Sequence, residues 1–100
     1  MSNKGKSEEE TLHNCIVGKN IRYLRKQKKL TQSDIAKAIQ VSFQQVQKYE
    51  KGLNGLHSHN LHKIAHRVFN VSMDVLTDPQ MIDQAKGLVE ETHYEAPEWR

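Results

Sequence analysis

The sequence contains little that would place the chain in a secreted, membrane or disulfide-bonded class. It has a single cysteine, Cys15, so no internal disulfide can form and a reducing compartment is expected. The first ten residues hold no apolar stretch typical of a signal peptide. No run approaches the ~20 apolar residues that a transmembrane helix needs. We therefore expect a cytoplasmic protein without a membrane partner.

The sequence also lacks a strand pattern, an internal repeat and a low-complexity segment. Its 100 residues suit one domain and leave no room for a second catalytic or ligand-sensing domain of ordinary size. Hydrophobic residues make up 36% of the chain and charged residues 27%, which excludes the composition of a disordered protein.

Positive charge is concentrated in residues 19–51, although the whole chain carries only +3. This segment holds nine Lys or Arg residues against two acidic residues, a net charge of +7, whereas residues 72–100 hold two against seven, a net charge of −5. A basic block is the electrostatic footprint of polyanion binding, and a solvated charged face is the alternative. The block coincides with a pair of short predicted helices, which favours polyanion binding.

Helical periodicity and capping residues predict six helices. Ser7 and Glu10 form a capping box for a first helix that runs to about Lys28. Gly18 inside it either weakens the helix by ~1 kcal/mol relative to alanine or permits a close packing contact. The apolar stripe of this helix consists of Leu12, Ile16, Val17, Ile21 and Leu24.

Three later helix starts share an apolar residue, a hydroxyl N-cap and a second apolar residue at N4, the hydrophobic-staple pattern. These starts predict helices at about 32–39, 43–51 and 73–77. The three sets are Leu30, Thr31 and Ile35; Val41, Ser42 and Val46; and Val71, Ser72 and Leu76.

Two further helices follow from periodicity. One starts after Ser58, and Asn70 ends it in the left-handed conformation. The other follows Asp78 as cap and Pro79 at N1. Their apolar faces are Leu61, Ile64, Ala65 and Val68 in the first, and Met81, Ile82, Ala85, Leu88 and Val89 in the second.

The helices at 32–39 and 43–51, joined by a tight turn, suit a pair whose second helix projects from the surface. With Val46 and Tyr49 inward, the outward side chains are Phe43, Gln44, Gln47 and Lys48. Glutamine can bond adenine through N6 and N7, and an apolar group can contact the thymine methyl. The predicted readers are therefore the two glutamines, the phenylalanine and Lys48. The alternatives are a phenylalanine folded onto the core and glutamines that are mere surface polars.

Contacts to the DNA backbone are predicted on either side of these readers. Gln32 opens the first helix of the pair, where a side chain and free backbone amides can meet a phosphate. Lys48, Lys51 and the amides of Asn54 and Gly55 can grip the neighbouring phosphates. Gln45, at N3 behind Ser42, suits a capping box at least as well as a base contact.

The segment IRYLRKQKKLTQSDIAKAIQVSFQQVQKYEKG closely resembles the Cro/phage-repressor (Xre-like) helix-turn-helix family of DNA-binding proteins. The resemblance runs from about Gly18 to Leu76 and covers all five family helices. The matching positions are Thr31, Gln32, Ile35, Ala36, Val41, Ser42, Val46, Tyr49, Glu50, Lys51 and Gly52.

This resemblance implies an all-α, lambda-repressor-like five-helix domain, to which the chain adds a C-terminal amphipathic helix. It implies that Gln32 contacts phosphate, that residues 43, 44, 47 and 48 face the groove, and that Arg25 pairs with Glu50. It also implies a homodimer on near-palindromic duplex DNA. The family commonly has glycine in the turn where this chain has Gln40; a left-handed glutamine there costs on the order of 1–2 kcal/mol, unless the turn is reshaped.

The expected organisation is a disordered tail at 1–6, a helix-turn-helix domain at 7–78, a C-terminal helix at 79–91 and an extended acidic tail at 92–100. The C-terminal helix either packs on the core or dimerises. Tyr94 and Trp99 in the tail either dock on a partner or are unstructured. Cys15 is expected to pack as a small apolar group.

The favoured hypothesis is a non-enzymatic, cofactor-free transcriptional regulator, a repressor that occludes promoter DNA. The alternative is an antitoxin or adaptor that binds another protein through the C-terminal helix and tail. A metal-dependent enzyme would use His59, His62 and His66, but no cysteine or carboxylate completes such a site. A solvated or interface face, able to make dimerisation pH-sensitive, is therefore favoured for these histidines, and no metal site is predicted.

Overall fold

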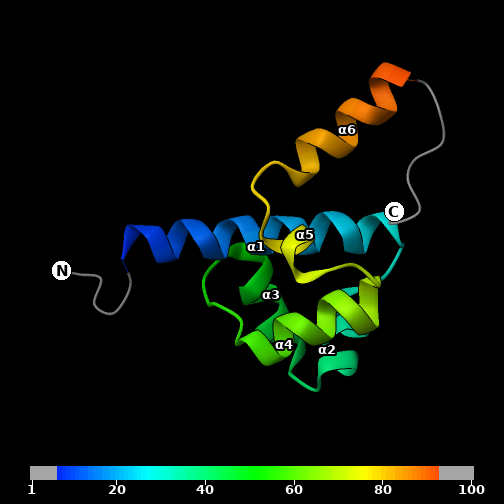
Figure 1. Ribbon diagram of the computed structural model, residues 1–100. Helices are drawn as coiled ribbons and strands as arrows, with labels where there is room; N and C mark the ends of the chain where they lie inside the picture. The colour runs from blue at the N-terminus through cyan, green and yellow to red at the C-terminus, as the bar shows by residue number, and fades with distance from the viewer. Residues whose placement is uncertain (1–6, 93–100) are drawn as a thin grey trace.

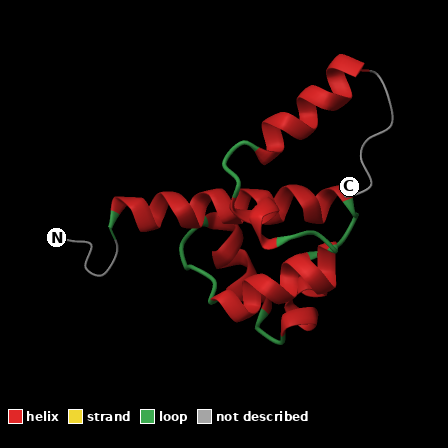
Figure 2. Cartoon of the chain, in the orientation of Figure 1, coloured by secondary structure: helices red, strands yellow, loops and turns green. Residues whose placement is uncertain are grey.

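The computed structural model describes residues 7–92 and the side chains of residues 7–86. Within that range the backbone is helical and contains no strand, so the expected all-α class is confirmed (Figure 2). The elements are α1 (Glu8–Gln27), α2 (Gln32–Ile39), α3 (Phe43–Lys51), α4 (Ser58–Lys63), the π-helix η1 (Ile64–Phe69), α5 (Met73–Thr77) and α6 (Met81–Thr92).

The long helix α1 runs across the molecule and organises the rest (Figure 1). Helices α2, α3 and α4 lie together on one side of it, whereas α6 extends away from them. The core lies between α1, the helix pair, α4–η1 and α5. Its fully buried side chains are Leu24, Ile35, Val46, Ile64, Ala65, Phe69 and Leu76.

Local capping fixes the starts of three helices. The hydroxyls of Ser7, Thr31 and Ser42 each accept a hydrogen bond from the backbone N–H three residues on, at 3.0 Å. At α2 the box is complete, because the Thr31 N–H donates to Asp34 Oδ2 at 2.8 Å. This backbone hydrogen bond is the main cause that lowers the pKa of Asp34 below its usual value, and the Thr31 side chain is the second. Ser72 occupies the N-cap of α5 but makes no side-chain cap bond, so that part of the staple prediction is wrong.

The buried stripe of α1 differs from the predicted one. Leu12 is 62% exposed and Ile16 is half-buried, so neither belongs to the core. Asn14 and Asn20 are buried in their place, together with Val17. These asparagines lie at helical spacing with the apolar residues of the stripe. A prediction based on hydrophobic residues alone does not include them, because asparagine is polar.

Asn20 ties α1 to the end of α5. Its Nδ2 lies 2.9 Å from the carbonyl oxygens of Leu76 and Asp78 and 3.4 Å from that of Val75. The carbonyls of Val75 and Leu76 lie in the last turn of α5, where carbonyls lack intrahelical partners, and the buried amide supplies one. The Asp78 carbonyl also accepts from the Met81 N–H at 3.2 Å. The contact fixes where the chain leaves the domain toward α6.

The fourth helix begins and ends differently from the prediction. Its N-cap is His57, not Ser58, and it makes no side-chain cap bond. From Ile64 the turns widen into η1, which rotates Phe69 into the core and leaves Val68 half-buried. Asn70 ends the helix in the left-handed conformation as predicted, with φ 56° and ψ 47°.

Helix α6 starts later than predicted. Asp78 Oδ1 accepts from the Gln80 N–H at 2.9 Å, but Pro79 lies in a turn and the helix begins at Met81. Met81 joins the core cluster and Ala85 is buried, so the first turns pack on the domain. The predicted contributions of Leu88, Val89, Tyr94 and Trp99, and both predicted tails, fall outside the described side chains or residues.

Candidate nucleic-acid interface

The turn between α2 and α3 keeps the left-handed geometry that suits glycine. Gln40 has φ 62° and ψ 48°. The N–H groups of Gln40 and Val41 both donate to the Ala36 carbonyl, the latter at 3.0 Å. The turn is therefore not reshaped around the glutamine, and the strain falls on this residue.

Replacing Gln40 by glycine is expected to raise the free energy of unfolding by about 1 kcal/mol, because glycine adopts positive φ without steric cost. Asn70→Gly is the matched control: Asn70 is also left-handed, with φ 56°, but asparagine tolerates that region better. Its gain should be smaller. Urea unfolding measures both, and a Gln40→Gly variant no more stable than the unmodified chain would contradict the assignment of strain.

Helix α3 has one anchored face and one open face. Val46 and Tyr49 are 0% and 5% exposed and anchor it to the core. Gln44 and Lys48 are exposed, and Phe43 is 42% exposed rather than folded onto the core. The predicted groove-facing residues thus lie along one open face, with Gln47 half-buried beside it.

Glu50 and Arg25 lock α3 to α1. Arg25 Nε donates to Glu50 Oε2 at 2.7 Å and Nη2 to Oε1 at 3.0 Å, in a pair whose side chains are 12% and 3% exposed. A third guanidinium nitrogen, Nη1, donates to the Leu30 carbonyl at 3.0 Å. A bidentate, desolvated pair of this kind fixes orientation as well as contributing energy.

Gln32, the predicted phosphate contact, is only half-buried but is already engaged. Its Nε2 donates to Glu50 Oε1 at 2.9 Å. One glutamine donor is thus used inside the ion-pair network, which leaves its second N–H and its carbonyl oxygen. Sequence reasoning missed this role, because it depends on α2 and α3 meeting at Glu50.

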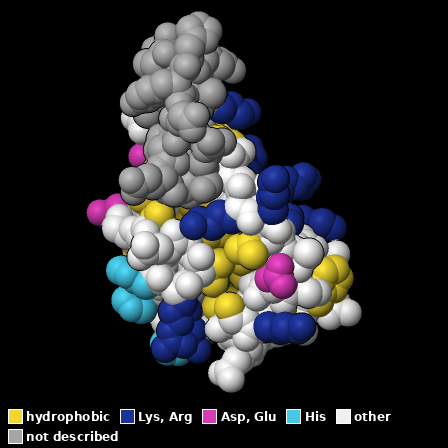
Figure 3. All heavy atoms as spheres, turned by 90° about the vertical axis from the view of Figure 1, so that its right-hand side faces the viewer, with side chains coloured by type: hydrophobic (Ala, Val, Ile, Leu, Met, Phe, Trp, Pro, Cys, Tyr) yellow, Lys and Arg dark blue, Asp and Glu magenta, His cyan; other side chains and the backbone are white. Residues whose placement is uncertain are grey.

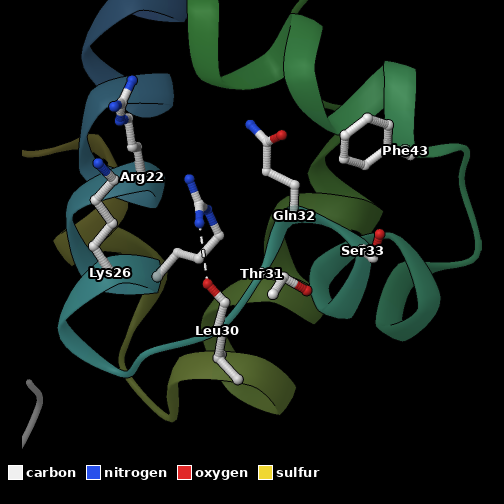
Figure 4. Close-up of a pocket in the computed structure, with 8 residues that line it drawn as sticks. Arg22, Lys26, Leu30, Thr31, Gln32, Ser33 and Phe43 are labelled. Atoms are coloured by element: carbon white, nitrogen blue, oxygen red, sulfur yellow. Dashed lines mark hydrogen bonds between the residues drawn. The ribbon is translucent and has the colours of Figure 1, made fainter.

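An open cleft of about 500 Å³ lies beside this network, between α1 and the start of α2 (Figure 4). Arg22 and Lys26, one turn apart on α1, form one wall, and Thr31, Ser33 and Phe43 lie opposite. Both cations are exposed, and neither forms an ion pair among the described residues. Figure 3 shows many Lys and Arg and few acidic side chains on the face that holds this end of α1.

The loop after α3 carries the remaining predicted contacts. Gly52 ends the helix in the left-handed conformation, with φ 76°. Lys51 and Gly55 are exposed and Asn54 is half-buried. The backbone N–H groups of Asn54 and Gly55 donate no hydrogen bond within residues 7–92.

The α4 histidines lie apart from these residues. His59, His62 and His66 are exposed, and the rings of the last two are 4.3 Å apart. In the described part of the chain, no three His, Cys, Asp or Glu residues are grouped as metal ligands. No helix in that part is both long and apolar enough to cross a bilayer.

Comparison with known families agrees with this geometry. The profile described as helix-turn-helix, HTH_3, matches residues 21–76, more than half of the chain. The chain belongs to the HTH_3 helix-turn-helix family. The match covers α2, α3 and the α4–η1 helix, and ends within α5. The first three turns of α1 and all of α6 lie outside it.

Curated relatives of this HTH_3 chain are described as transcriptional regulators. The uncharacterized HTH-type transcriptional regulator y4wC of Sinorhizobium fredii is 45% identical over 49 residues, which are 49% of this chain and 34% of that protein. An uncharacterized transcriptional regulator in the ATPase CF(0) region of Rhodospirillum rubrum is 41% identical over 61 residues, 59% of this chain and 56% of that protein. The chain thus spans about a third to a half of these relatives. No solved structure matches it.

Proposed function

We propose that this chain is a sequence-specific DNA-binding transcriptional regulator whose helix α3 enters the major groove. The main support for this proposal is the open face at the amino end of α3, where Phe43, Gln44 and Lys48 are exposed. Val46 and Tyr49 anchor the opposite face of the helix to the core. A recognition helix contacts base edges with its amino-terminal residues. Membership of the helix-turn-helix family and the description of the relatives as transcriptional regulators support the same function.

In this proposal, Gln44 and Gln47 bond adenine edges, Phe43 packs on a thymine methyl, and Lys48 faces the groove. The 42% exposure of Phe43 is consistent with this role, since it leaves part of the ring open to a thymine methyl. These side chains determine which sequence is bound.

Backbone contacts flank the readers on both sides. Gln32 meets one phosphate with its backbone amide and remaining side-chain donor, and Lys51 with the amides of Asn54 and Gly55 meets another. The cleft adds Arg22 and Lys26, whose charges attract the same strand. These contacts contribute affinity and salt dependence without reading sequence.

We further propose that the chain acts as a homodimeric repressor on a near-palindromic site with half-sites ~34 Å apart. Residues 7–78 would form the DNA-binding domain and residues 79–91 the dimerisation helix. The first turns of α6 pack on the domain, but its later turns extend away from it, which supports this division (Figure 1) and equally suits an adaptor that binds another protein. A mass measurement of the free chain, with and without the segment after Thr77, distinguishes a homodimer from a monomer.

Alanine at both Gln44 and Gln47 is expected to remove sequence preference while sparing non-specific binding. Each bidentate contact discriminates by ~1–3 kcal/mol, so the pair accounts for roughly thirtyfold or more between the preferred site and a shuffled duplex. The measurement is a binding-site selection on random duplex DNA, followed by titrations of the selected and shuffled duplexes at one salt concentration.

Gln45→Ala is the matched control, because Gln45 lies between the two readers in sequence but occupies N3 of α3, where its N–H donates to the Ser42 hydroxyl. It should keep the preference of the unmodified chain. If the double variant also keeps that preference, α3 is not the reading element.

A further inference from the structure

Asn14 lies on α1 before the matched family segment, yet it is only 5% exposed. It faces the loop that follows α3. A Cβ added to Gly55 would lie 2.8 Å from Asn14 Oδ1, and one added to Gly52 would lie 2.8 Å from Cys15 Sγ. Two consecutive residues of α1 therefore lie against the two glycines of this loop.

Few backbone hydrogen bonds hold the loop, although Leu56 packs against the core. The last bonds of α3 run from the N–H groups of Gly52 and Leu53 to the carbonyls of Tyr49 and Lys48, at 3.0 Å and 2.9 Å. Beyond them, no backbone N–H of residues 54–57 donates a hydrogen bond within the described residues. The position of Gly55 thus depends on packing against α1 rather than on backbone bonds.

Asn14 is a costly residue for packing alone. Its Nδ2 is buried and has no hydrogen-bond partner among the described residues. A buried donor left unpaired destabilises the fold, and an apolar side chain of similar size would fill the space without that loss. The amide is therefore better explained by its placement against Gly55 than by its contribution to the core.

We propose that Asn14 is a positioning residue for DNA binding: its side chain sets the place of Gly55 and so directs the free amides of Asn54 and Gly55 at one DNA phosphate. The inference rests on the proposed function, because it needs the loop to meet DNA. It assigns to the first turns of α1, which lie outside the family match, a role in the binding of the DNA backbone.

Asn14→Leu tests the proposal, because it removes the unpaired donor and puts wider methyl groups against Gly55. The thermal midpoint should stay at or above that of the unmodified chain. Affinity for a short duplex carrying the selected site should fall about tenfold, the loss expected for a hydrogen bond to a charged group. The slope of log K against log salt should stay unchanged, because the lost contact is made by uncharged backbone amides and involves no counterion release.

Gly55→Ala tests the same contact from the loop side, where a substitution in an exposed segment leaves the core intact. In the native background its Cβ meets Asn14 Oδ1, so affinity should fall by a similar factor. In an Asn14→Ala background the clash is gone, so Gly55→Ala should have little further effect. Leu12→Ala, on an exposed part of the same helix, is the control and should bind as the unmodified chain does.

Failure of the proposed function and failure of the positioning role of Asn14 give different results. If the unmodified chain binds no duplex, the proposed function falls and the inference with it. If the unmodified chain binds and Asn14→Leu keeps its affinity, only the positioning role is overturned. Effects of Asn14→Ala and Gly55→Ala that multiply independently would overturn it as well, because residues in contact couple.

Discussion

Glu50→Gln is expected to lower the free energy of unfolding by about 3 kcal/mol, the loss typical of a buried ion pair that loses one partner. The substitution keeps the shape of the side chain but leaves the Arg25 guanidinium, 12% exposed, without a counter-charge. It also replaces the charged acceptor of Gln32 Nε2 by an amide. Urea unfolding, with the midpoint and slope compared with those of the unmodified chain, measures the change.

The control for this loss is Glu9→Gln, an exposed glutamate in the first turn of α1, whose change should not exceed about 1 kcal/mol. The double variant Arg25→Gln/Glu50→Gln should lose less than the sum of the two single variants, because the unpaired charge is then absent. A loss below 1 kcal/mol for Glu50→Gln would show that the pair does not lock α1 to α3.

Gly18→Ala is expected to destabilise the domain even though alanine favours helices. A Cβ at this position would lie 2.3 Å from the Tyr49 carbonyl oxygen and 2.8 Å from that of Glu50. Those are backbone atoms, so α1 and α3 would have to separate. Overpacking of this kind costs about 1–3 kcal/mol or more, which outweighs the ~1 kcal/mol gained in helix propensity.

Thermal unfolding of Gly18→Ala should therefore show a midpoint roughly 10 °C lower, for a net loss of about 2 kcal/mol in a domain of this size. Lys19→Ala, one residue on and exposed, should change stability by no more than about 0.5 kcal/mol. If Gly18→Ala proves as stable as the unmodified chain, α1 and α3 are not in backbone contact at this point.

The elements that the sequence predicted best are those controlled by neighbouring residues. The bounds of α2 and α3 follow from caps and staples within four residues, and the structure gives the predicted ranges. Helix α5 also has its predicted range, although Ser72 makes no side-chain cap bond. Inward placement of Val46 and Tyr49 follows from helical spacing in the same way. The start of α6 was misjudged, since a cap and a proline suit a turn as well as a first helical turn.

The tertiary structure decided the rest, because it depends on groups that come together only on folding. From the sequence, Gly18 is compatible with either a weakened helix or a close contact, and the packing of α3 shows that it is a close contact. The sequence likewise does not show that Gln32 donates to Glu50, because the two residues meet only in the folded structure. Asn20 donates to carbonyls 55 to 58 residues away in sequence, and helical periodicity cannot predict contacts over that separation. The sequence by itself therefore determined the helices and the residues that their open faces present, because caps and spacing act over single turns. Tertiary packing decided which polar and glycine residues hold those faces in place, because packing brings backbone atoms that are distant in sequence into van der Waals contact.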